Sequence, residues 1–143
     1  MSGAGAAGGG RLQSAEELYK QGRAIEDRVA TSPQQAQANL QQARNDYIQA
    51  LGANPSPQLE AYIRAGIGNV AFYQDDYQTA VQQFSAAYGH LDDPNLKAMA
   101  LLRLGMAEQR LGRFEQADRT FMTLQQQFPQ STAARVSRDK FGA

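Results

Sequence analysis

The chain carries the same pattern of large and small residues three times, at a constant spacing of 37 residues. Large residues occupy two positions of each copy, alanine a third, and alanine or leucine a fourth. The matching positions are Leu40/Tyr77/Phe114, Ala43/Ala80/Ala117, Tyr47/Phe84/Phe121 and Ala50/Ala87/Leu124. Steps of three and four residues within each copy place these positions on one face of a helix. A chain that repeats one helical face at a fixed period is predicted to stack similar units against one another.

Residues beyond position 11 are expected to be helical throughout, because Ala, Gln, Leu, Glu and Arg dominate and strand-like alternation is absent. Ser14 with Glu17 forms a predicted capping box. Three Ser-Pro or Asp-Pro pairs each predict the start of a further helix: Ser32-Pro33, Ser56-Pro57 and Asp93-Pro94. We therefore expect three antiparallel helix pairs at about 14–52, 56–90 and 93–129, followed by a short capping helix at 131–141.

The individual helices are expected to end at glycines, prolines or acidic breaks. The first helix should carry the apolar stripe Ala15, Leu18, Gly22, Ile25 and Val29, and end near residues 30–33. The next five should end near Gly52, Tyr73, His90, Gly112 and Phe128, and the last should run from Thr132 to about Lys140. The fold class that follows is all-α.

The repeated unit resembles the tetratricopeptide repeat family. The third unit matches the family signature best, through Leu101, Leu104-Gly105, Gly112, Phe114, Ala117, Phe121 and Pro129. The second matches through Ile67-Gly68 and departs from the pattern at Arg64 and Ala71, as the third does at Glu108. In the first unit Gly22 lies nine residues too early, which predicts an insertion that displaces the first helix. The resemblance covers about residues 12–141 and implies a right-handed solenoid of three helix pairs closed by a capping helix.

The third unit and the tail also resemble the C-terminal repeats of bacterial envelope proteins, such as the periplasmic coordinator of the Tol–Pal system. The turn Phe128-Pro129-Gln130-Ser131-Thr132-Ala133 carries this resemblance. Residues 1–11 are expected to form a flexible Gly/Ala-rich leader, without the basic flank and apolar run of a signal peptide. The expected compartment is therefore the cytoplasm by default, or the periplasm if the chain is a fragment of an exported protein.

The composition argues against several functional classes. The formal net charge is zero, with 14 Lys+Arg and 14 Asp+Glu, so the chain offers no long-range field for a nucleic acid. No cysteine is present and His90 is the single histidine, which leaves no triad or zinc-type ligand set. The acidic pairs Asp75-Asp76 and Asp92-Asp93 are expected to cap helices. We therefore predict no enzyme activity, no cofactor, no metal, no nucleic-acid partner and no membrane insertion.

The family resemblance implies that the first helix of each pair lines a concave groove. The partner-binding residues expected there are Tyr62, Asn69, Tyr73, Met99, Arg103, Met106 and Arg110. Family members that bind a C-terminal carboxylate use a clamp of Lys, Asn and Arg, of which Asn69 and Arg103 match while Ala65 and Met99 replace the lysines. An aromatic, Met and Arg surface instead suits a peptide or helix of a partner protein.

Two alternatives remain open at this point. Part of the expected surface, Met106 above all, could belong to the hydrophobic core. The chain could also be a self-associating assembly module, with the open N-terminal end of one copy stacking on another.

Overall fold

The computed structural model describes residues 12–141, so the predicted leader at 1–11 and residues 142–143 lie outside the described residues. The described part contains seven helices and no strand, which confirms the all-α prediction. The helices are α1 (Ala15–Glu26), α2 (Pro33–Leu51), α3 (Pro57–Tyr73), α4 (Tyr77–Tyr88), α5 (Pro94–Arg110), α6 (Phe114–Gln127) and α7 (Thr132–Phe141).

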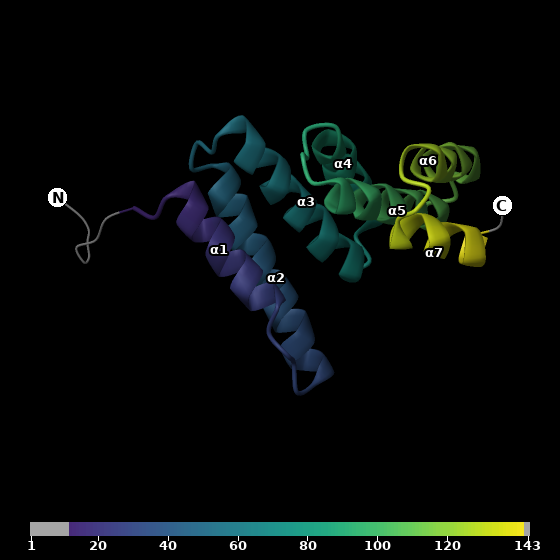
Figure 1. Cartoon of the computed structure of the whole chain (residues 1–143). Coiled ribbons are helices and arrows are strands. Elements are labelled where there is room, and N and C mark those ends of the chain that lie inside the picture. The colour runs from purple at the N-terminus through teal and green to yellow at the C-terminus, as the bar shows by residue number, and fades with distance from the viewer. Residues whose placement is uncertain (1–11, 142–143) are drawn as a thin grey trace.

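Consecutive helices pack as three hairpins, α1 on α2, α3 on α4 and α5 on α6. The hairpins follow one another in space in the order of the chain, joined by contacts of α2 with α3 and of α4 with α5 (Figure 1). The first helices α1, α3 and α5 also contact one another, whereas α7 packs on α5 and α6. The first helices therefore form a layer of their own.

The helix starts follow the predicted capping chemistry. The Ser14 hydroxyl accepts a hydrogen bond from the Glu17 backbone N–H at 3.1 Å, and the Glu17 carboxylate accepts one from the Ser14 N–H at 2.9 Å. Ser32, Ser56, Asp76 and Asp93 cap α2, α3, α4 and α5 in the same way, by accepting a backbone N–H of the first turn. These side chains satisfy donors that a helix cannot pair internally.

The predicted end of the first helix is wrong. α1 ends at Glu26, and Val29, which we expected on its apolar stripe, is 90% exposed. The backbone N–H of Arg28 bonds to the Ile25 carbonyl, three residues back, so the turn tightens and the helical ladder stops there. The chain needs the following residues to reverse direction before Ser32 caps α2. The other predicted helix ends lie within two residues of the observed ones.

An aromatic ring from each second helix packs against a glycine of its first helix. A Cβ added to Gly68 would lie 3.1 Å from the Phe84 ring, and one added to Gly105 would lie 2.4 Å from the Phe121 ring. A side chain at Gly105 would force the Phe121 ring or the helices to move, and one at Gly68 would need the Phe84 ring to shift by a few tenths of an ångström. The repeated aromatic and glycine columns are therefore one contact made once in each hairpin.

The first hairpin makes the same contact. A Cβ on Gly22 would lie 2.6 Å from the Tyr47 ring, so Gly22 corresponds to the later glycines although its sequence spacing differs. The predicted insertion therefore lies between Gly22 and Tyr47, in the α1–α2 connection and in α2, which has 19 residues against 12 in α4. The first unit is a complete hairpin with an extended tip.

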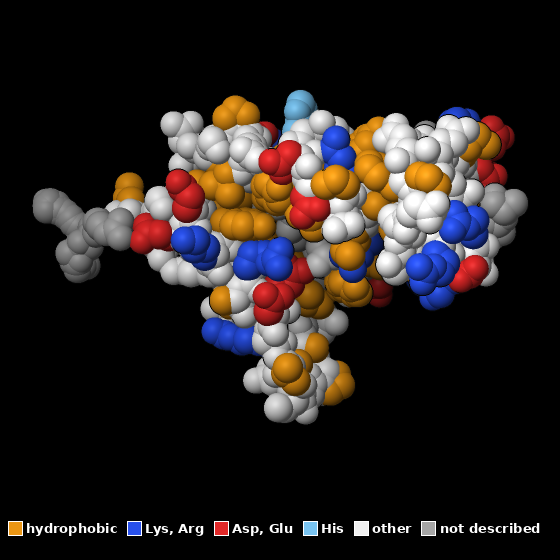
Figure 2. Space-filling model, in the orientation of Figure 1, with side chains coloured by type: hydrophobic (Ala, Val, Ile, Leu, Met, Phe, Trp, Pro, Cys, Tyr) orange, Lys and Arg blue, Asp and Glu red, His pale blue; other side chains and the backbone are white. Residues whose placement is uncertain are grey.

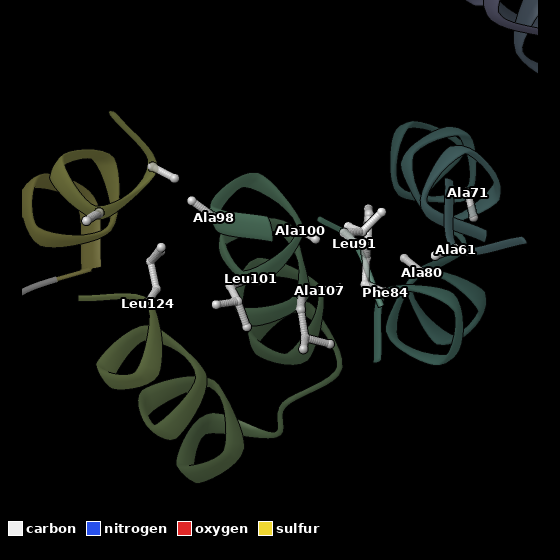
Figure 3. Packing of buried hydrophobic residues seen from close by; sticks show 13 residues of the cluster. Ala61, Ala71, Ala80, Phe84, Leu91, Ala98, Ala100, Leu101, Ala107 and Leu124 are labelled. Carbon is white, nitrogen blue, oxygen red and sulfur yellow. The ribbon is translucent and has the colours of Figure 1, made fainter. Parts of the chain in front are cut away.

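Elsewhere in the core, small side chains let the helices approach one another closely. Ala43, Ala80 and Ala117 are all 0% exposed. Figure 3 shows the labelled alanine and leucine side chains of α5 directed both toward the second hairpin and toward α6. This arrangement lets α5 pack closely on neighbours at both sides.

The column Leu40/Tyr77/Phe114 at the start of the second helices is only partly buried. Phe114 is 63% exposed, whereas its counterpart Tyr77 packs against Phe72 and is covered by Arg110 of the next hairpin. The helix that follows α6 is α7, which has 10 residues against 17 in α5. In the described part of the chain, no residue corresponding to Arg110 lies over Phe114.

Glu108 is buried between α5 and α6 at the position where the family pattern has tyrosine. Burial raises the pKa of Glu108, against smaller opposing effects of Thr120, Arg113 and Arg119. The Thr120 hydroxyl lies 2.6 Å from the Glu108 carboxylate and 3.0 Å from the Gln116 carbonyl, but it has one hydrogen to donate. The Thr120 hydroxyl therefore shares its one hydrogen between the Glu108 carboxylate and the Gln116 carbonyl.

The Gly105→Ala substitution is expected to lower the free energy of unfolding by about 1–2 kcal/mol in urea denaturation. The gain in helix propensity, roughly 1 kcal/mol, is outweighed by overpacking against Phe121, whose ring is stacked on Phe141 at 4.9 Å. Gly89→Ala is the matched control, because nothing lies within 4 Å of its added Cβ. Equal stabilities of the two variants would contradict the contact.

Glu108→Gln is expected to raise the urea midpoint at pH 7, because it removes a buried charge and keeps a partner for Thr120. Since the folded pKa of Glu108 is raised, wild type loses stability relative to the variant as pH rises through that pKa. Below the ordinary value of 4.5 both side chains are neutral, so the difference should vanish. A difference that does not change with pH would contradict a buried titrating group.

Candidate binding groove

The first helices of the three hairpins line a groove with a volume of about 340 Å³. Its walls come from α1 with its C-cap Asp27, from α3 and from α5, and Phe84 is the single contribution of a second helix. On the face shown in Figure 2, hydrophobic side chains gather in the middle, with Lys, Arg, Asp and Glu side chains around them. The layer of first helices therefore lines a groove on the side where the family resemblance implied one.

The structure brings four of the seven predicted residues into the wall of this groove: Tyr62, Asn69, Met99 and Arg103. Tyr73 lies beside them, because Arg103 contacts it. Arg110 and Met106 do not line the groove. Arg110 is exposed two turns further along α5, and Met106 is half-buried.

Asn69 is the centre of a hydrogen-bond network at the floor of the groove. Its side-chain N–H donates to Glu26, and its carbonyl oxygen accepts from Arg103. Glu26 also accepts a hydrogen bond of 2.6 Å from the Tyr47 hydroxyl. Arg103 donates to the Tyr73 hydroxyl at 3.1 Å and lies 5.4 Å from the centre of that ring. The network thereby joins α1, α2, α3 and α5.

Sequence reasoning missed Glu26 and Tyr47 as members of the network. Tyr47 is 0% exposed, and burial together with its bond to Glu26 raises its pKa strongly. The available signal was the column Tyr47/Phe84/Phe121, in which one member carries a hydroxyl. A hydroxyl in an otherwise apolar buried column requires a polar partner.

Two further tyrosines are fixed by aspartates beside the groove. The Tyr62 hydroxyl donates to Asp92, and this bond raises the pKa of Tyr62 to about 12. The Tyr77 hydroxyl accepts from Arg110 at 2.9 Å and donates to Asp75 at 2.8 Å. The predicted acidic pairs therefore divide their roles, since Asp76 and Asp93 cap helices while Asp75 and Asp92 orient tyrosines.

The chemistry of this surface is that of hydrogen bonding, stacking and apolar contact. Ala65 and Met99 line the groove where clamp-type family members have lysine. Within residues 12–141, no three His, Cys, Asp or Glu side chains come together in a way that could hold a metal ion. No helix in the same range is long and apolar enough to span a bilayer.

A double-mutant cycle of Glu26→Gln and Arg103→Gln is expected to give a coupling of about 0.5–1 kcal/mol in the free energy of unfolding, because Asn69 links the two charges. The coupling should fall when the cycle is repeated in an Asn69→Ala background. Glu16→Gln supplies the control partner for Arg103, since Glu16 lies exposed at the opposite end of α1. A coupling that survives without Asn69 would contradict its bridging role.

Comparison with known proteins supports the family resemblance. Residues 99–131 match the family model of the tetratricopeptide repeat, a range that covers most of α5, all of α6 and the turn before α7. No curated protein matches the chain. The similarity of the tail to Tol–Pal coordinators stays a prediction. The chain thus contains a tetratricopeptide repeat at residues 99–131, and its helical hairpins form a fold of the tetratricopeptide-repeat type.

Proposed function

We propose that the chain is a non-catalytic interaction module that binds a peptide or helix of a partner protein in the groove lined by α1, α3 and α5. The observation that carries the proposal is Met99, which is 42% exposed within the wall of a concave surface. An apolar side chain left in contact with water inside a groove is stabilised when a partner covers it. Protein binding is also the usual role of tetratricopeptide repeats.

The composition of the groove supports a polypeptide partner. Tyrosine and arginine dominate the binding energy of many interfaces, and the flexible thioether of methionine adapts to different apolar partners. The wall combines these types in Tyr62, Met99 and Arg103. Because Asn69 and Tyr73 hold Arg103 in place, little side-chain entropy remains to be lost there on binding.

The size of the groove indicates how much of a partner it holds. A volume of about 340 Å³ lies near the lower end of the range for small-molecule pockets. It accommodates one or two anchoring side chains, while the rest of the segment lies along the surface.

Self-association is the second candidate function. The observation that favours it is Phe114, a large ring that is 63% exposed outside the groove because no following helix covers it. Light scattering over a range of concentrations separates the two candidates. A chain that stays monomeric throughout excludes self-association and leaves partner binding in the groove. A role in the bacterial cell envelope, which the resemblance of the third unit and the tail suggests, is a further proposal.

Met99→Ala is expected to weaken binding of a groove-selected peptide by at least about tenfold, because it removes an apolar anchor. The peptide is selected from a displayed library on the immobilised protein, and its Kd is measured by fluorescence anisotropy. Met122→Ala is the matched control, since Met122 is 57% exposed on α6 outside the groove. Tyr62→Ala combined with Met99→Ala should abolish binding while circular dichroism stays helical. Equal losses for Met99→Ala and Met122→Ala would exclude the groove as the binding site.

A further inference from the structure

Two arginines on one face of α5 form no ion pair with an acidic side chain of residues 12–141. Arg103 and Arg110 are seven residues apart, which is two helical turns, so their side chains leave the helix in similar directions. Each guanidinium lies 5.4 Å from the centre of a tyrosine ring, Arg103 over Tyr73 and Arg110 over Tyr77. The ion pairs formed by the described residues are Arg23–Asp27, Arg44–Asp76 and Arg64–Glu60, and neither arginine of this face takes part.

The hydrogen-bond partners of both arginines are neutral. Arg103 donates to the Asn69 amide oxygen and to the Tyr73 hydroxyl. Arg110 donates to the Tyr77 hydroxyl, and that hydroxyl in turn donates to Asp75. A guanidinium has five N–H donors, so both retain donors that none of these contacts uses.

The carboxylates of the groove do not neutralise these cations by direct contact. Glu26 accepts from Tyr47 and Asn69, and Asp27 lies 3.9 Å from Arg23. Both belong to the α1 side of the groove, whereas the two arginines lie on α5. The α5 side therefore presents positive charge that is held in place by tyrosines.

We propose that the segment bound in the groove is acidic and continues along α5 beyond it, with two carboxylates about 10 Å apart, one for Arg103 in the groove wall and one for Arg110 outside it. This inference rests on the proposed function and specifies its partner. Seven residues at the helical rise of about 1.5 Å give that spacing, which a bound helix matches with acids at i and i+7 and an extended segment with acids at i and i+3. The N–H donors that each guanidinium does not use are suited to pairing with a carboxylate of the partner.

The two arginines should contribute unequally. Arg103 lines the groove and is half-buried, so water screens its charge less than that of the exposed Arg110. Asp75 also shares the Tyr77 hydroxyl with Arg110, which places a carboxylate near that cation. Loss of Arg103 should therefore weaken binding more than loss of Arg110.

The test is a selection of displayed 15-residue random peptides on the full chain at low salt, followed by Kd measurement of synthetic copies. Enrichment of Asp or Glu pairs at one of the two spacings is the expected result. Arg103→Gln with Arg110→Gln should weaken these peptides by at least about tenfold, and added salt should weaken the wild-type complex. The control is Arg28→Gln with Arg119→Gln, which removes the same charge from exposed positions outside the groove.

A charge exchange makes the assignment specific. Arg103→Glu should abolish binding of an acidic peptide and restore binding of a copy in which one acid is replaced by arginine. Circular dichroism checks that each variant stays helical.

The outcomes separate this inference from the proposed function. If the selected peptides are neutral or basic and bind the Met99→Ala variant more weakly than wild type, the acidic partner is overturned. The groove remains the binding site in that case. An equal loss of affinity for acidic peptides in the control variant, Arg28→Gln with Arg119→Gln, would also overturn the inference. The attraction would then be a general property of the charged surface. Failure to select any peptide that depends on Met99 would overturn the groove itself.

Discussion

The contact between an aromatic ring of each second helix and a glycine of its first helix is the constraint on which the structure depends. Tyr47 and Phe121 meet Gly22 and Gly105 at distances that leave no room for a Cβ, and Phe84 meets Gly68 at a distance that leaves almost none. This contact fixes how closely the two helices of a hairpin approach. Because it is the same in all three hairpins, it also sets the first helices in one layer, and that layer is the wall of the groove.

In the first hairpin this packing contact and the polar floor of the groove meet in one residue. Tyr47 lies between Gly22 of its own hairpin and Gly66 of the next, and its ring is fully buried. Its hydroxyl reaches Glu26, from which hydrogen bonds continue through Asn69 to Arg103. The position of Arg103 is therefore linked through hydrogen bonds to the packing of a helix two hairpins away. A phenylalanine at position 47 could make the packing contact but not the link.

Sequence reasoning reached those features that depend on neighbours along the chain. Helix starts at Pro33, Pro57 and Pro94 and the capping box at Ser14 were predictable because a cap and its partner lie within one turn. The exposure of Phe114 was not, since it depends on which residues of the next helix pack alongside. Asn69 bonds to Glu26 and Arg103, which are 43 and 34 positions away from it in the sequence, so no local pattern predicts this network. Of the expected site, four residues lie in the groove wall because the helical period is regular, whereas Met106 turns partly toward the interior.

The groove is small, with a volume of about 340 Å³, so under the proposed function charge and geometry have to add to its apolar contacts for it to be selective. Buried area alone does not determine affinity, whereas complementary charges fix the register of a partner and disfavour wrong ones. The chain has no net charge, yet its acids and bases are not evenly paired, because three arginines outside the α5 face have carboxylate partners and the two on that face have tyrosines. Stacking on tyrosine holds a guanidinium in position without neutralising it. Arg103 is thus held by Asn69 and Tyr73 in the free protein, and the acidic partner that we propose would meet a cation that needs little rearrangement to bind it.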